Sequence, residues 1–172
     1  MEREKQIGVE FAKVVTCYKN SKLAHAQGDS LSAFHQMVNA LYHQGNVSLL
    51  ENDLQPDVCV WEQVKANDYE TYKLYVELIS GEEELTKRID LLLIANEFVI
   101  MRRVRSASRH IQSIMGAAGF LWTKENLLLH PELQWYQSDL NNFLDFLIDK
   151  QVIKSVLLDR SENGVPDFRY CV

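Results

Sequence analysis

The chain has 172 residues, of which 47% are hydrophobic and 24% are charged, and this balance argues against an intrinsically disordered protein. Its net charge of −6 argues against broad electrostatic binding to nucleic acid or to an anionic membrane surface. Only seven glycines and three prolines occur, which favours helices over a turn-rich β fold.

The three cysteines and the first residues indicate where the protein works. Cys17, Cys59 and Cys171 show neither a CxxC motif nor zinc-ligand spacing, so we expect a reduced, cytoplasmic protein. The charged first residues lack the apolar segment of a secretory signal. The longest apolar run, residues 91–95, is too short to span a bilayer, so we do not expect this to be a membrane protein.

Apolar residues recur at helical spacing from the start of the chain. They predict one helix over residues 2–27 and a second over residues 31–49. Between the two, Gly28 indicates a helix stop, and Asp29 or Ser30 an N-cap.

The next segment is predicted to hold a short helix followed by an aromatic one. Pro56 ends the second helical region, and Asp57 can cap a short helix that contains Val60, Trp61 and Val64. Asn67 or Asp68 then begins another helix. Its tyrosines are three residues apart and lie on one face. A homodimer that buries this face is expected, and the alternative is that the face lies against an upstream domain. The candidate interface residues are Trp61, Tyr69, Tyr72 and Tyr75.

The clearest helix start in the sequence is Ser80 with Glu83, which together form a capping box. The helix that they begin is predicted to continue to Arg109. It carries two adjacent apolar positions per turn, which implies burial against more than one neighbour. Residues 1–115 therefore predict an antiparallel helical bundle.

Residues 116–119, Gly-Ala-Ala-Gly, are the predicted linker to a second module over residues 120–172. Thr123 can cap a helix to Leu129, and Ser138 can cap another over residues 139–149. β-branched residues, a turn at residues 161–164 and a final alternating segment then predict a hairpin.

The fold class that we expect is thus mainly α: an antiparallel helical bundle, then a small winged-helix-like module with a C-terminal β-hairpin. Winged helices often place their third helix in the DNA major groove. Here that helix carries Asp139, Asp145 and Asp149 against one lysine. Because phosphate contacts dominate DNA affinity, we do not expect tight binding of nucleic acid, and a packing or protein-contact module is favoured.

One dense basic cluster interrupts this acidic chain, and its members are candidate binding residues: Arg102, Arg103, Arg105, Arg109 and His110. Four arginines exceed what a helix dipole needs, so some of them, Arg105 and Arg109 first, are predicted to contact phosphate. Arg105 and His110 also match the Arg-x4-His spacing of HEPN-type ribonucleases, a short pattern that arises readily by chance.

No complete catalytic apparatus is visible. The sequence contains no GxSxG, P-loop or GxGxxG motif, so we predict no catalytic residues and no cofactor in this chain. His25, His35 and His43 are not spaced as a helical metal pair, and we predict no metal site; these histidines are expected at polar surface or partly buried positions.

Three segments carry a family resemblance: residues 55–65 (QPDVCVWEQVK), 72–78 (YKLYVEL) and 83–93 (EELTKRIDLLL). With the opening IGVEFAK over residues 7–13 and the final module, they make nearly the whole chain similar to the YgxA-like bacterial nucleotidyltransferase-like proteins. In that family a catalytic domain precedes a helical substrate-binding domain and a helix-turn-helix domain, and the resemblance covers the last two.

The resemblance implies a non-catalytic C-terminal part that helps to bind substrate or nucleotide beside an upstream active site. The superfamily's Asp-x-Asp pair, which holds the metal, is absent from this sequence. Mg²⁺ and a nucleoside triphosphate are therefore expected only if an upstream catalytic domain exists, and such a domain would be a partner. The alternatives are a free-standing protein-interaction module and, less favoured, a HEPN-type ribonuclease.

Overall fold

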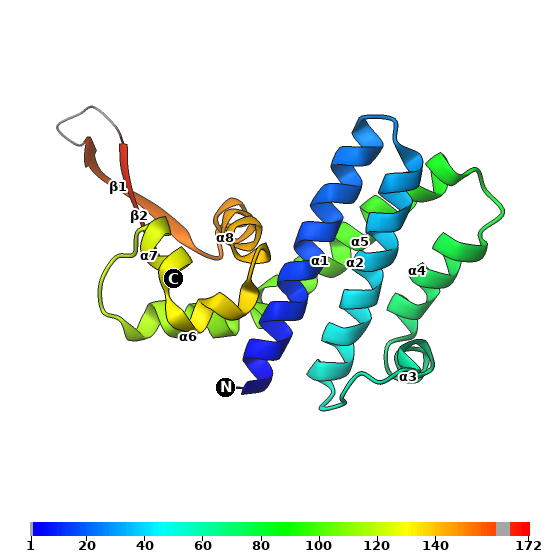
Figure 1. Ribbon diagram of the computed structural model, residues 1–172, viewed down its shortest axis with the longest axis horizontal. Helices are drawn as coiled ribbons and strands as arrows, with labels where there is room; N and C mark the ends of the chain where they lie inside the picture. Colours follow the sequence, from blue (N-terminus) through cyan, green and yellow to red (C-terminus); the bar gives the residue numbers. More distant parts are fainter. Residues whose placement is uncertain (1, 161–165) are drawn as a thin grey trace.

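The computed structural model describes residues 2–160 and 166–172, and it is mainly helical with a two-stranded antiparallel hairpin at its C-terminal end (Figure 1). The bundle contains α1 (Glu2–Ala26), α2 (Ser30–Glu51), α3 (Val60–Asn67), α4 (Tyr69–Ser80) and α5 (Leu85–Ala107). The remaining elements are α6 (Arg109–Ala117), α7 (Lys124–Leu129), the 3-10 helix η1 (Pro131–Tyr136), α8 (Asp139–Asp149), β1 (Lys154–Arg160) and β2 (Pro166–Cys171). The predicted fold class is confirmed.

The first two helices form an antiparallel pair whose turn follows the predicted chemistry. Gly28 adopts a φ of 80°, a conformation that glycine reaches without steric cost. Asp29 then caps α2, since its carboxylate accepts a hydrogen bond of 3.0 Å from the backbone N–H of Ser32. Figure 1 shows α1 and α2 side by side along most of their length.

The second half of α2 is the centre of the bundle. Every residue from 44 to 50 is buried, although a surface helix buries only one stripe. α1, α3, α4 and α5 all contact this helix. Gly45 allows α3 to approach closely, because a Cβ atom at this position would lie 2.9 Å from a methyl group of Val64.

Two predicted helix starts are wrong. Ser80 is the last residue of α4, and its hydroxyl donates to the carbonyl of Val76 at 2.8 Å instead of capping α5. Gly81 ends α4, so α5 begins only at Leu85. Likewise Asp57 does not cap α3: its carboxylate accepts from the N–H of Cys59 at 2.6 Å, and the helix begins at Val60.

The predicted cap at Asp68 is confirmed, whereas the long helix predicted to reach Arg109 is divided. Asp68 accepts a hydrogen bond from the N–H of Thr71 at 3.1 Å and so begins α4. α5 ends at Ala107, and the hydroxyl of Ser108 donates to the carbonyl of Val104 at 2.6 Å. Hydroxyls that bond back to the preceding turn often bend helices, and α6 begins directly after this bend.

The C-terminal module has three helical segments followed by the hairpin. Thr123 caps α7 as predicted, accepting from the N–H of Asn126 at 3.0 Å, but Ser138 precedes α8 without a capping hydrogen bond. The strands pair from Lys154 with Cys171 onward, and the predicted turn over residues 161–164 lies outside the described residues.

The predicted linker is only partly a linker, because Gly116 and Ala117 belong to α6. Gly119 follows with a φ of 66° and lets the chain turn towards α7. The division into residues 1–115 and 120–172 stays a prediction.

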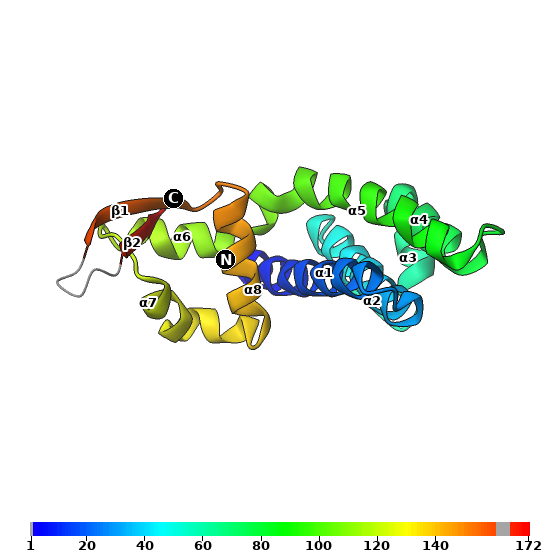
Figure 2. The same ribbon diagram turned by 90° about the horizontal axis from the view of Figure 1, so that it is seen from above.

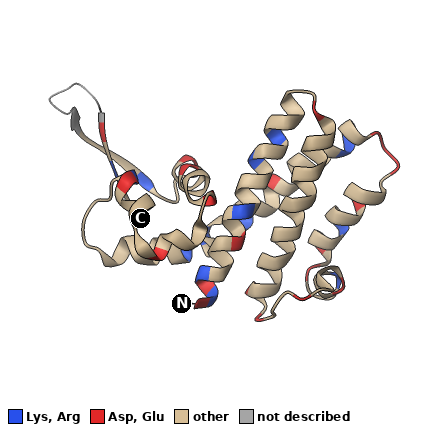
Figure 3. Cartoon of the chain, viewed as in Figure 1, with Lys and Arg blue, Asp and Glu red and all other residues tan. Residues whose placement is uncertain are grey.

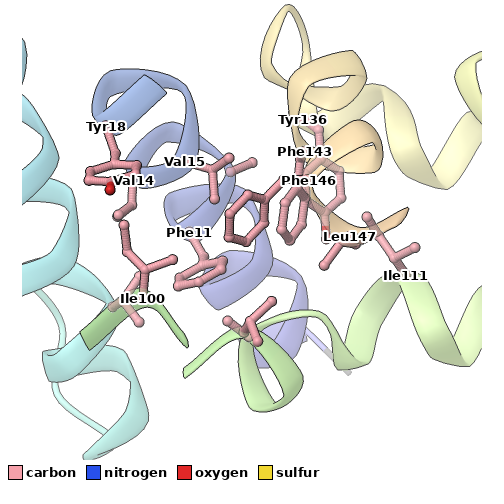
Figure 4. Packing of buried hydrophobic residues seen from close by; sticks show 14 of the residues in the cluster. Phe11, Val14, Val15, Tyr18, Ile100, Ile111, Tyr136, Phe143, Phe146 and Leu147 are labelled. Atoms are coloured by element: carbon pink, nitrogen blue, oxygen red, sulfur yellow. The ribbon is translucent and has the colours of Figure 1, made fainter. Parts of the chain in front are cut away.

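One hydrophobic core runs through both parts of the molecule. Phe11 of α1 meets Phe143 of α8 edge to face at 5.8 Å between ring centroids, and Tyr136 stacks on Phe143, also at 5.8 Å. Figure 4 shows these rings between Ile100 of α5 and Ile111 of α6. Within the described part of the chain, no helix is both long enough and apolar enough to cross a membrane.

Candidate binding site

A partly buried carboxylate joins α1 to α2. Glu10 of α1 accepts a hydrogen bond of 2.6 Å from Lys13, one of 2.8 Å from the Nδ1 atom of His43 and one of 2.9 Å from the amide of Asn46. Burial alone would raise the pKa of Glu10, but the hydrogen bonds from His43, Lys13 and Asn46 outweigh it and lower the pKa to about 2. Glu10 is therefore ionised and fully partnered at neutral pH.

Beside this carboxylate lies a pocket of about 430 Å³, where the bundle meets the C-terminal module. Its walls come from α1, the end of α2, the segment after α2, and η1. The residues that supply its polar and aromatic lining are Glu2, Lys5, Gln6, Glu10, Asn46, Gln55 and Trp135. Pockets of this volume lie within the range that small molecules occupy in proteins.

One wall of the pocket is the exposed indole of Trp135, which has the ammonium group of Lys5 beside it. Trp135 of η1 is 60% exposed, and the ammonium group of Lys5 lies 4.4 Å from its ring centroid. Lys5 also pairs with Glu2 at 2.9 Å. The bundle thus supplies the charges, and the C-terminal module supplies a flat apolar face.

Asn46 is the strongest sign that this pocket takes a ligand. The residue is only 7% exposed, its amide nitrogen donates to Glu10, and its amide oxygen is buried without a hydrogen-bond partner among the described residues. Buried polar atoms are nearly always paired, so an unpaired one on a pocket wall calls for an explanation. A ligand or water that donates a hydrogen bond supplies one.

The carboxylate at this pocket has little free capacity for proton transfer. Glu10 already accepts three hydrogen bonds, so it has little capacity to act as a general base. Among the described residues, no group of three or more His, Cys, Asp and Glu side chains is placed to hold a metal ion. These residues therefore do not fit the Mg²⁺ ion of a nucleotidyl transfer.

The structure separates the predicted basic cluster. Arg102 pairs with Glu70 of α4 at 2.6 Å. Arg103 lies deeper, where it donates to Asp68 at 2.6 Å and to the backbone carbonyl of Gln44 at 3.3 Å. These two arginines hold α4 and α2 against α5, which is a structural task. Figure 3 shows lysine and arginine spread over both parts of the molecule.

The other three members of the cluster differ in burial. Arg105 and Arg109 are exposed, and neither makes an ion pair with any residue that the structure describes. His110 is 4% exposed, and its Nδ1 atom lies 3.0 Å from the hydroxyl of Tyr136. Burial lowers the pKa of His110. A ribonuclease histidine must reach its substrate, so this packing position does not support the ribonuclease alternative; the phosphate contact of Arg105 and Arg109 stays a prediction.

The four predicted aromatic interface residues form two pairs. Trp61 stacks on Tyr75 with 3.5 Å between ring centroids, and both rings pack partly against the core. Tyr69 and Tyr72 lie 6.0 Å apart, and only Tyr69 is exposed. Their role as an interface stays a prediction.

Sequence reasoning missed the pocket itself. Glu10 falls among the apolar residues of α1, and His43 was expected at a polar surface or partly buried position without a role. One signal was present: the polar run from His43 to Asn46 interrupts the apolar stripe of α2. That run does not reveal its partner, because the pairing with Glu10 depends on how α1 and α2 are aligned.

The third helix of the C-terminal module packs against the bundle. Phe143, Phe146 and Leu147 of α8 are buried, and α8 packs against α1. Along α8 only Asn141 and Asp149 are exposed. The helix that would enter a groove in a DNA-binding winged helix is covered by the bundle here.

Comparisons with known proteins agree with this architecture. A YgxA-like substrate binding domain model matches residues 4–103, and a helix-turn-helix domain model matches residues 109–172. The "Uncharacterized protein YgxA" of Bacillus subtilis (strain 168) is 34% identical over 164 residues, covering 95% of this chain and 55% of the relative.

A solved structure shares the whole fold. The nucleotidyltransferase-like protein from Exiguobacterium sibiricum 255-15 superposes with a TM-score of 0.90 at 30% sequence identity, covering 99% of this chain and 59% of that one. This chain therefore spans little more than half the length of each of these relatives.

Proposed function

Because the chain belongs to the YgxA-like substrate-binding domain family, we propose that it holds the substrate of a nucleotidyltransferase-like protein in the pocket beside Glu10 and Trp135. The observation that carries the proposal is Asn46, which lines this pocket and whose buried amide oxygen has no hydrogen-bond partner among the described residues.

An accessory role fits the chemistry better than a catalytic one. Nucleotidyl transfer needs carboxylates that hold metal ions, and the sequence contains no Asp-x-Asp pair. Both relatives are considerably longer than this chain, and one is named nucleotidyltransferase-like. The transfer step itself would therefore take place on a further catalytic domain, placed next to the bundle.

The lining of the pocket defines the class of substrate. Asn46 and Gln6 bring amide groups to the lining, for hydroxyls or amines, and Glu2 brings a carboxylate. Trp135 offers a flat face to a ring. A hydroxyl- and amine-bearing ring compound, such as an amino sugar or a nucleoside, satisfies these groups.

Tryptophan fluorescence tests the proposal directly. Of the three tryptophans, Trp135 lines the pocket, whereas Trp122 is buried and Trp61 is stacked on Tyr75. We expect an amino sugar or a nucleoside to change the emission of the wild-type chain. The change should be lost in Trp135→Phe and kept in Trp61→Phe, the matched control.

A second variant separates ligand contact from folding. Gln6 lines the pocket and makes no side-chain hydrogen bond with any described residue, so Gln6→Ala should fold normally. We expect it to weaken binding roughly tenfold, the loss of about one hydrogen bond. A spectral change that persists in Trp135→Phe, or an affinity unmoved by Gln6→Ala, would show that the substrate binds elsewhere.

A further inference from the structure

The outer side of α5 carries an apolar stripe that nothing in the described chain covers. Its members are Leu91, Ile94, Phe98 and Met101, with exposed fractions of 56%, 60%, 71% and 41%. Their spacing of three, four and three residues is the a/d pattern of a coiled-coil seam. Figure 2 shows α5 along one long edge of the molecule, with no other element outside it.

α5 is apolar on two opposite sides. Its inner side buries Ile89, Leu92 and Ile100 in the bundle, where α5 contacts α1, α2 and α4, as the predicted burial against more than one neighbour requires. A contiguous exposed row of large apolar side chains is costly in water and marks an interaction surface. No element of the described chain covers the outer row of α5, so a partner for this row would come from outside the described residues.

The stripe has acidic residues on one flank and a basic residue on the other, so two copies can match opposite charges. In heptad terms, Asp90 and Glu97 occupy the g positions on one flank, and Arg102 occupies an e position on the other. We propose that the stripe pairs with the same stripe of a second copy, with the two α5 helices parallel about a two-fold axis that runs between them. Glu97 of each copy then faces Arg102 of the other.

Both charged groups keep capacity for this contact. Arg102 donates to Glu70 through one nitrogen, and its side chain remains 61% exposed, so other N–H groups are available. Glu97 accepts from the hydroxyl of Tyr18 through one oxygen only. An antiparallel pair would instead set the acidic flank of one copy against the acidic flank of the other, which is unfavourable.

Light scattering over a micromolar to sub-millimolar concentration series tests the pairing. A single helix pair is a small interface, so we expect a concentration-dependent dimer. Phe98→Glu should weaken the dimer by at least roughly tenfold, since it buries a charge in the seam. Leu31→Glu, which alters an apolar residue that is 75% exposed on α2, is the matched control and should leave the dimer unchanged.

The parallel orientation of the two α5 helices is tested by disulfide cross-linking and by exchanging the charges at residues 97 and 102. In a Cys59→Ser background, Phe98→Cys should oxidise to a symmetric disulfide between copies if α5 is parallel. Glu97→Arg and Arg102→Glu should each weaken the dimer roughly threefold, and the double variant should restore it. A single-chain mass at all concentrations, or a dimer abolished by Tyr69→Glu but kept in Phe98→Glu, would overturn the proposal.

Discussion

At the residue scale, Glu10 holds a negative charge within the contact of α1 and α2 because three donors surround it. Such a group links stability to pH. Its folded pKa of about 2 lies below the ordinary 4.5, so its contribution is complete above about pH 4.5 and is lost as the pH falls towards 2. The shift corresponds to about 3 kcal/mol.

We therefore expect Glu10→Gln to be less stable than the wild type at pH 7 and to lose much less stability on acidification to pH 3. The glutamine keeps the shape of the side chain but not its charge. Urea unfolding at the two pH values measures the difference. Glu82→Gln, at an exposed position, is the control and should follow the wild type. An unchanged pH dependence in Glu10→Gln would contradict the role of this carboxylate.

At the element scale, the coverage of α8 by α1 determines how the C-terminal module can meet DNA. The exposed residues of α8 are Asn141 and Asp149, which offer phosphate no positive charge. We predict only weak binding of a labelled duplex, measured by fluorescence anisotropy, that disappears at physiological salt. A sequence-specific complex at nanomolar concentration would require α8 to leave α1 and would contradict this prediction.

The elements also show where sequence reasoning succeeds. Periodic apolar residues predicted each long helix, and local side-chain chemistry identified the caps at Asp29, Asp68 and Thr123. It misplaced the helix boundary at Ser80 and missed the bend at Ser108, since a serine hydroxyl can cap the next helix or bond the previous turn equally well.

The candidate site was harder to foresee than the fold. The pocket depends on contacts between residues far apart in sequence, such as Lys5 with Trp135 and Glu10 with His43. No local pattern encodes them. The basic cluster, by contrast, was visible in the sequence. In the structure, however, Arg102 and Arg103 form ion pairs with residues of the neighbouring segment, Glu70 and Asp68.

At the scale of the whole molecule, the bundle and the C-terminal module are joined through one core, so we expect them to unfold together. The junction depends on a close approach at Gly8 of α1. A Cβ atom there would collide with the hydroxyl of Tyr136 and would lie 3.3 Å from the carbonyl of Ala107. Both neighbours are fixed, since Tyr136 is 1% exposed and hydrogen-bonded to His110.

Replacing Gly8 with alanine should therefore separate the two parts of the molecule slightly and destabilise both. We expect Gly8→Ala to cost about 1–3 kcal/mol, as overpacked cores do, and to lower the melting temperature by roughly 2–12 °C in a single calorimetric transition. Gly116→Ala is the matched control. Its Cβ atom would lie 3.7 Å from Val172, an ordinary contact, so the variant should gain about 0.5–1 kcal/mol from helix propensity alone. If Gly8→Ala splits the transition into two, with one unshifted, the bundle and the C-terminal module fold independently and the shared core does not couple them.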